Sequence, residues 1–329
     1  MQDPAVSALP SPPPHPRSYG CVFTAKAPVM DGDVDHKSWS AAPWSEDFMD
    51  IEGPRHNPQP RLRTRVKMLW DSKCLYIGAK MEEPRLWATL TERDSVIFRD
   101  HDFEVFLDPD GDNHQYVELE MNALNTVWDL LLPKPYRDGG PAINEFDIAG
   151  LRTGVKLDGK LNDPSHPSRG WSATIAIPWS SIKMLSSSPA PPHDGDRWRI
   201  NFSRVEWDLD LVNGEFHKIE GRPEHNWVWS PQWAINMHRP ETWGFMEFQK
   251  RPRPVKQDPY WKERCELMDL YYRERAHREA HGGYVKPTDL GLSFNGYFLM
   301  HEGMWLASLK AKDSAVLTVR EDSRLTVSR

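Results

Sequence analysis

Short runs of alternating apolar and polar residues fill most of residues 19–249. In residues 63–71, every second side chain from Thr64 to Trp70 lies on one face of an extended chain, and residues 75–81 repeat the alternation after a turn. This pattern predicts a β-hairpin. The same strand signal recurs at residues 103–108, 115–121, 126–132, 151–158, 171–178, 197–207 and 242–249.

Strands at this density, with turn-forming residues between them and almost no helical period, predict a mostly β protein. The favoured architecture is an antiparallel β-sandwich rather than an α/β fold. Residues 177–185 have room for one short helix after a strand, and the composition of residues 186–196 is that of a loop.

The pattern changes after Lys250, where a proline-spaced connector precedes a helical segment. Asp258 is the expected N-cap, Pro259 suits the first helical position, and Gly282 ends the helix. Three later runs, at 297–300, 305–311 and 315–320, predict a small β appendage. The side chains expected to dock the helix on the sandwich are Trp261, Cys265, Met268 and Tyr272.

The predicted organisation therefore has three parts. Residues 1–18 are a Pro/Ser/Ala tail that we expect to be disordered, because such a composition cannot hold a packed core. Residues 19–250 form the β-sandwich, and residues 251–329 form an extension made of a helix and a β-hairpin.

Charge and composition exclude several classes of function. The net charge of −7 and the lack of any Lys/Arg block argue against a nucleic-acid surface. No apolar run is long enough to span a membrane, and the N-terminus lacks the basic start and apolar run of a secretory leader. The three cysteines are too far apart in sequence for a CxxC metal knuckle or a dense disulfide framework. Most of the 15 tryptophans must be core, and a few could be platforms for a ligand.

Residues 101–122, HDFEVFLDPDGDNHQYVELEMN, hold the main candidate site. If strands 103–108 and 115–121 pair across the 108–114 connection, their apolar side chains enter the core. Their polar side chains then share the other face, and the predicted opposite pairs are Phe106 with Tyr116, Glu104 with Glu118, and Asp102 with Glu120.

Four carboxylates on one face need compensation, because like charges opposite each other destabilise a sheet. Water, an arginine, a cation or the hydroxyls of a ligand could supply it. An acidic face with an aromatic neighbour is typical of a sugar site. The alternative is a solvated outer face that Arg199 or Arg204 neutralises.

Two aspartate groups were considered as calcium sites. The loop with Asp108, Asp110 and Asp112 is not an EF-hand, because glycine is fourth and leucine is twelfth, which leaves a tight polar turn or a weak surface calcium site. A second trio, Asp31, Asp33 and Asp35, is either a calcium site or a capped turn that leads into a buried tryptophan.

Six blocks in order resemble the carbohydrate-binding module family 9-like (CBM9-like) β-sandwiches, a group related to DOMON domains. They are VMDGDVDHKSW (29–39), VKMLWDSKCLYIGAKMEEP (66–84), DFEVFLDPDGDNHQYVELEMN (102–122), GWSATIAIPWSSI (170–182), WRINFSRVE (198–206) and HRPETWGFMEF (238–248). The resemblance implies a noncatalytic module of the kind attached to xylanases and related glycosidases. It also implies that calcium can brace the scaffold, and that a terminal sugar lies between two tryptophans, with carboxylate, amide and arginine groups around its hydroxyls.

The residues that the resemblance assigns to such a site are spread along the chain. Glu104 transfers as a hydroxyl acceptor, and Phe98 stands where the first clamp ring is expected. Met237 lies near the second clamp position, where Trp243 or Trp233 could supply the ring. An acid, Glu118 or Glu120, replaces the arginine that the family pattern leads one to expect. The full predicted set of ligand-binding residues is Glu104, Phe98, Asp102, Glu118, Glu120, Asn201, Ser203 and Trp243.

The main functional hypothesis is therefore binding of a glucose- or xylose-type oligosaccharide. The alternative is a protein-interaction or structural sandwich that has lost the sugar clamp. A glycosidase is the third hypothesis, although no nucleophile elbow, phosphate loop or dinucleotide glycine pattern occurs.

Overall fold

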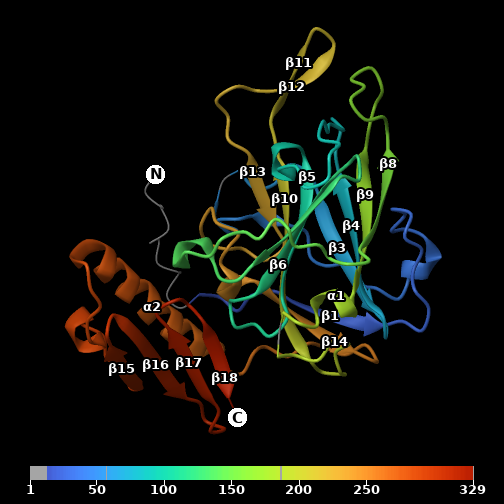
Figure 1. Ribbon diagram of the computed structural model, residues 1–329. Coiled ribbons are helices and arrows are strands. Elements are labelled where there is room, and N and C mark those ends of the chain that lie inside the picture. The colour runs from blue at the N-terminus through green and yellow to red at the C-terminus, as the bar shows by residue number, and fades with distance from the viewer. Residues whose placement is uncertain (1–12, 57, 186, 329) are drawn as a thin grey trace.

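The alternating segments form one large curled sheet in the computed structural model, which describes residues 13–56, 58–185 and 187–328 (Figure 1). Ten strands follow one another side by side. In spatial order they are β7 (Val127–Leu132), β6 (Tyr116–Asn122), β5 (Asp102–Asp108), β10 (Arg197–Glu206), β14 (Gly244–Gln249), β1 (Ser18–Phe23), β3 (Thr64–Trp70), β4 (Cys74–Glu82), β9 (Gly170–Pro178) and β8 (Arg152–Asp158).

Two further strands branch from this path, since β13 (His225–Val228) pairs with β10 and β2 (Met49–Asp50) pairs with β13. A separate hairpin of β11 (Leu209–Val212) and β12 (Glu215–Lys218) projects from the end of the sandwich (Figure 1). The short helix α1 (Trp179–Ile182) follows β9, as the sequence predicts. The 3-10 turns are η1 (Lys37–Trp39), η2 (Ile97–Arg99), η3 (Tyr136–Asp138), η4 (Pro240–Thr242) and η5 (Pro287–Leu290).

The predicted β-sandwich is confirmed, and its two halves are joined by β1. This strand pairs in parallel with both β14 and β3, whereas the other strand pairs of the sheet are antiparallel. The two halves curl toward each other, so that Met68 and Ile77 of one half share a buried cluster with Val105 and Leu119 of the other. The alternation of each strand therefore separates a core face from an outer face.

The register between β5 and β6 differs from the prediction by two residues. Glu104 lies opposite Glu120 rather than Glu118, and Phe106 lies opposite Glu118. The physical reason is the 108–114 connection, which is held open by the Asp108 carboxylate as it accepts backbone hydrogen bonds within the loop. Because the shift is even, every side chain stays on its predicted face.

The extension contains the helix α2 (Trp261–His281) and a four-stranded sheet of β15 (Tyr297–His301), β16 (Met304–Lys310), β17 (Val316–Arg320) and β18 (Leu325–Ser328). The helix ends before Gly282 as predicted. It begins two residues later than predicted, because the Asp258 carboxylate accepts the amide of Tyr260 and the guanidinium of Arg264 instead of capping. The fourth strand, β18, was not predicted.

The predicted docking stripe of α2 does contact the sandwich. The ring of Trp261 lies 5.6 Å from the guanidinium carbon of Arg199, and the Tyr272 hydroxyl donates to Glu241. The remaining buried face of α2 packs on the four-stranded sheet, in a core cluster separate from that of the sandwich. The extension is thus a small second layer against one end of the sandwich (Figure 1).

The predicted tail falls mostly on residues 1–12, which lie outside the described residues. Of the rest, His15 stacks on Phe245 at 5.2 Å and accepts the backbone amide of Asp258, and Ser18 begins β1. Among the described residues, no helix is both long and apolar enough to cross a membrane.

Candidate functional site

The candidate site lies on the outer face of β5 and β6. Glu104 projects from β5 and Glu120 from the opposite position on β6, with Glu118 two residues earlier on the same face. Asp102 shares this face at the end of β5, next to Asn122. The predicted convergence of the four acids is therefore present, with the pairs shifted.

A pocket of about 340 Å³ opens over three of these acids, Glu104, Glu118 and Glu120. Its walls come from segments far apart in the sequence, because η2, β7, η3 and the loop after β13 all reach over the β5–β6 face. The other lining residues are Ile51, Phe98, Phe106, Trp128, Tyr136, Val205, Glu224, Asn226, Ile235, Asn236, Met237 and His238.

The acids are buried under this cover, which changes their protonation. Burial raises the pKa of Glu104 to about 7. For Glu118 and Glu120, burial and then the neighbouring charge of Glu104 raise the pKa well above the usual range. Burial and the charge of Glu104 also raise the pKa of Asp102. A ligand that interacts favourably with the ionised carboxylates would therefore lower these raised pKa values when it binds.

His238 closes one side of the pocket and is held in place by aromatic neighbours. Its Nδ1 atom lies 2.9 Å from the Tyr116 hydroxyl, and its ring meets the edge of Tyr136 at 4.4 Å. Burial and the nearby Arg137 lower the pKa of His238 to about 3. The imidazole is therefore neutral at pH 7, and its Nε2 atom lies 4.0 Å from the Glu118 carboxyl group.

The predicted clamp forms only in part. Phe98 lines the pocket and is 38% exposed, so its ring can contact a ligand. Trp243 is fully buried, its ring packs on Phe106 and Tyr116, and its Nε1 donates to the Met237 carbonyl. It supports the rim from beneath and does not line the pocket, which corrects the prediction for this residue.

Three other predicted ligand residues also lie behind the pocket. The side-chain amide of Asn201 donates through Nδ2 to the Ser230 carbonyl and accepts the Ser230 amide at Oδ1, so this side chain has a structural role. Ser203 lies opposite Glu104 on β10 and is fully buried. Asp102 is fully buried beneath the wall and accepts the amide of Val205 at 3.0 Å.

Sequence reasoning missed the two rings that line the pocket beside Phe98, which are Trp128 and Tyr136. Trp128 lies on β7 directly opposite Glu120, so extending the strand pairing to residues 126–132 would have found it. Tyr136 lies in η3, where a loop conformation positions it, and no strand pattern signals that. Trp233, the other ring considered, lines a different pocket.

Neither arginine expected to neutralise the acidic face does so. Arg199 donates to the Trp243 carbonyl and packs on Phe245, and Arg204 pairs with Glu83 and Glu206. Within residues 13–56, 58–185 and 187–328, no lysine or arginine forms an ion pair with Asp102, Glu104, Glu118 or Glu120.

The loop Asp108 to His114 is a polar turn that anchors the extension. Asp108 accepts the amides of Gly111 and Asn113, and Asp112 pairs with Arg324 at 2.7 Å. The Asn113 side chain donates to the Ser323 carbonyl at 2.9 Å. These contacts give the loop a structural function.

The predicted calcium trio near the N-terminus makes ion pairs with lysines. Asp33 lies 2.7 Å from the Lys156 amine, and Asp35 pairs with Lys80. Asp31 accepts the amide of Asp33, as in a capped turn. This turn leads into Trp39, which is fully buried.

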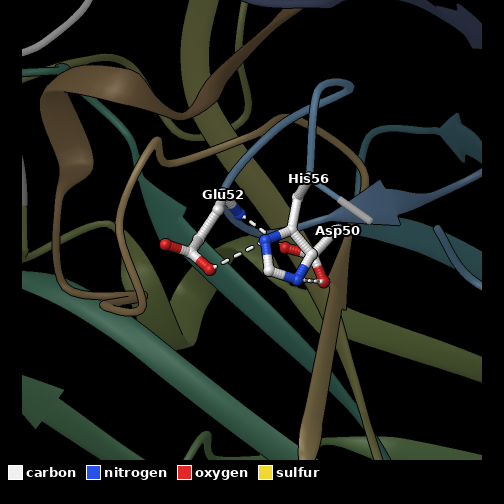
Figure 2. Close-up of side chains that lie close together, drawn as sticks. All are labelled: Asp50, Glu52 and His56. Atoms are coloured by element: carbon white, nitrogen blue, oxygen red, sulfur yellow. Dashed lines mark hydrogen bonds and ion pairs between the residues drawn. The ribbon is translucent and has the colours of Figure 1, made fainter. Parts of the chain in front are cut away.

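A mixed cluster of two carboxylates and one imidazole lies beside the pocket, next to Ile51 (Figure 2). The His56 ring lies between Glu52, 3.0 Å from Nδ1, and Asp50, 3.8 Å from Nε2. Each ring nitrogen of His56 thus faces a different carboxylate.

These observations define a general class of protein, namely a β-sandwich with an acidic, ring-lined pocket on an outer sheet face. Residues 30–130 match the family model described as "Carbohydrate family 9 binding domain-like". The resemblance predicted from the sequence is therefore confirmed for this segment, which includes β5, β6, Phe98 and Trp128.

Three solved structures are similar to this chain, and the first of them shows the same fold. A Bacteroides uniformis protein provisionally described as carbohydrate-binding is 16% identical with a TM-score of 0.51, covering 71% of this chain and 100% of its own. A family 9 carbohydrate-binding module from Caldicellulosiruptor kristjanssonii, in complex with cellotriose, is 18% identical with a TM-score of 0.44 and coverages of 73% and 100%. Its glucose complex is 17% identical with a TM-score of 0.43, and the coverages are 72% and 99%. A search of curated protein sequences gives no match.

Proposed function

We propose that this chain is a noncatalytic carbohydrate-binding module and that the pocket over β5 and β6 holds one end of a glucose- or xylose-type oligosaccharide. The observation that carries the proposal is the combination of three carboxylates with the rings of Phe98 and Trp128 in one pocket. Carboxylates accept hydrogen bonds from sugar hydroxyls, and rings cover the apolar face of a pyranose.

The family match supports this assignment of ligand class, since the matched segment supplies both strands of the acidic wall. Two similar structures hold cellotriose and glucose as bound ligands. These sugars are therefore the first ones to test, followed by xylo-oligosaccharides.

Binding without hydrolysis fits the geometry of the acids. A glycosidase needs two carboxyl groups on either side of the scissile bond. Here Glu104 and Glu120 project from neighbouring strands of one wall, directly opposite each other in the register. A sugar in the pocket would meet both carboxyls from the same side.

The alternative of a protein-interaction sandwich requires that the acidic face be covered. The residues that line the pocket lie between Ile51 and His238, and none of them comes from the extension. The extension instead contacts the 108–114 loop and the η3 and η4 regions. The open pocket favours a small ligand.

Titration of the full chain with glucose, cellobiose, cellotriose and xylotriose, followed by calorimetry and tryptophan fluorescence, tests the proposal. We expect one binding site and a response that Glu104→Gln reduces at least about tenfold, because a hydrogen bond to a charged group contributes about 1.5–3 kcal/mol. Asp110→Asn is the matched control, since Asp110 lies in the adjoining loop and outside this pocket. Equal binding by Glu104→Gln and the unmodified chain, or no binding of any of the four sugars, contradicts the proposal.

A further inference from the structure

We propose that Asp102, Glu104 and Glu120 hold a divalent cation of the calcium type at the base of the pocket. One carboxylate oxygen from each of these three residues lies within 4.8 Å of the other two. All three residues are buried, so the group is not the ordinary solvated acidic surface that lacks an ion. This inference does not depend on sugar binding.

An independent observation points to a missing ligand at the same place. The Oδ1 atom of Asp102 accepts the amide of Val205, but its buried Oδ2 atom has no hydrogen-bond partner. The residue is fully buried. Leaving a carboxylate oxygen without a partner in such a site destabilises the fold, so native proteins rarely do it. A cation bound by this oxygen would remove that destabilisation.

The charge balance of the wall leads to the same conclusion. Glu104 and Glu120 lie directly opposite each other, and no lysine or arginine of the described residues pairs with either of them. His238 is the nearest potential cation, yet it faces Glu118 and is neutral at pH 7. A divalent cation between the strands would attract both carboxylates and so offset the repulsion between them.

The ligand set selects the type of cation. The three residues offer only carboxylate oxygens, which suit hard cations such as Ca²⁺, whereas Zn²⁺ prefers sites with imidazole or thiolate. Calcium takes six to eight oxygens at about 2.3–2.6 Å, and the pocket above gives water or ligand hydroxyls access to the remaining positions. The His56 cluster, which contains an imidazole, is the natural comparison for Zn²⁺.

The other buried acids do not offer the same site. Around Asp108, backbone amides and Arg324 already occupy the carboxylates of the loop. Glu83 and Glu206 share the buried guanidinium of Arg204. Of the described acidic clusters, the wall of the pocket combines convergent oxygens with a buried carboxylate oxygen that has no hydrogen-bond partner, and no lysine or arginine pairs with its acids.

The test uses the full chain after treatment with a chelator, with Ca²⁺ as the only added ligand and no sugar present. We expect calorimetry to give one site per chain and the melting temperature to rise with Ca²⁺ concentration. Asp102→Asn and Glu120→Gln should each weaken the binding at least about tenfold, because affinity at such sites follows the number of charged ligands. Terbium offers a second readout, since Trp128 lies opposite Glu120 and can sensitise its luminescence.

Two control variants separate this site from the others. His56→Ala and Asp110→Asn should bind Ca²⁺ as the unmodified chain does, and circular dichroism confirms that all four variants are folded. The proposal is overturned if the chain binds no Ca²⁺ at millimolar concentration. It is also overturned if folded Asp102→Asn and Glu120→Gln keep full affinity, or if only the control variants lose it.

Discussion

Glu104 and Glu120 lie directly opposite each other on neighbouring strands, at the bottom of a pocket whose lining residues include no lysine or arginine. In most sheets such a pair is destabilising. Here both side chains are buried, so water screens the interaction between the two carboxyl groups only weakly. Several measurable properties follow from this arrangement.

The stability of the metal-free protein should fall as the pH rises from about 4.5 to about 7. Burial raises the pKa of Glu104 to about 7, above its ordinary 4.5. Between these values the Glu104 carboxyl holds more protons in the folded than in the unfolded chain, so its contribution to the free energy of unfolding decreases with increasing pH. Thermal melts in a chelator at several pH values measure the slope.

Glu104→Gln should flatten that slope, because the amide is neutral at every pH of the series. Glu215→Gln, which changes a side chain that is 80% exposed, is the control and should leave the slope unchanged. A variant with glutamine at position 104 that keeps the full pH dependence would show that other acids determine it.

Removing the ring of Trp128 should weaken sugar binding without unfolding the chain. The side chain is half-buried on β7 and lines the pocket, so Trp128→Ala removes ring contacts worth about 0.5–1.5 kcal/mol beyond area burial. This predicts a loss of affinity of at least about threefold in a glucose or cellotriose titration. Trp233 lines a separate pocket, so Trp233→Ala should bind the sugar as the unmodified chain does. Loss of sugar binding in Trp233→Ala but not in Trp128→Ala would show that the sugar binds in the other pocket.

Trp243 should behave in the opposite way, as a residue of stability. It is fully buried on Phe106 and Tyr116, and Trp→Ala at such a position costs about 3–5 kcal/mol in the free energy of unfolding. Denaturant titration measures the loss. The milder substitution Trp243→Phe keeps most of the packing and removes only the hydrogen bond to the Met237 carbonyl, so it should destabilise the chain less. A phenylalanine variant as unstable as the alanine variant would contradict this account.

The extension should loosen when its anchor on the 108–114 loop is removed. Asn113→Ala leaves the buried Ser323 carbonyl without its side-chain donor, and we expect a cost of about 1–3 kcal/mol. Hydrogen exchange of β17 and β18 would report the opening. Arg320→Ala, which removes a more exposed ion pair with Asp322, should cost less than about 1 kcal/mol.

The sequence predicted which residues form strands and which face each side chain takes, because alternation is a local property. It did not predict the register of β5 and β6, which depends on how the Asp108 carboxylate and positive backbone angles at Gly111, Asn113 and Gln115 shape the connection. The four acids were found because an even shift of register preserves faces.

The rest of the site could not be predicted because it depends on contacts between distant segments. The burial that shifts the pKa of Glu104 arises from side chains such as Met237 and Val205, more than 100 residues away in the sequence. The position of Trp243 also depends on distant residues. Its hydrogen bond to the Met237 carbonyl and its ring contact with Tyr116 place it beneath the rim rather than in the pocket. The family resemblance therefore predicts the scaffold better than it predicts which side chains line the pocket.

The parallel strand β1 joins Ser18 to Phe245 and, a few residues on, Val22 to Leu69. Pairing of chain segments so far apart is slow, because the entropy of closing a long loop is lost before the contacts form. During synthesis, residues 18–23 must therefore wait until almost the whole sandwich has emerged from the ribosome before the two halves can be sealed. For this protein, closure of the sandwich is therefore a late step of folding.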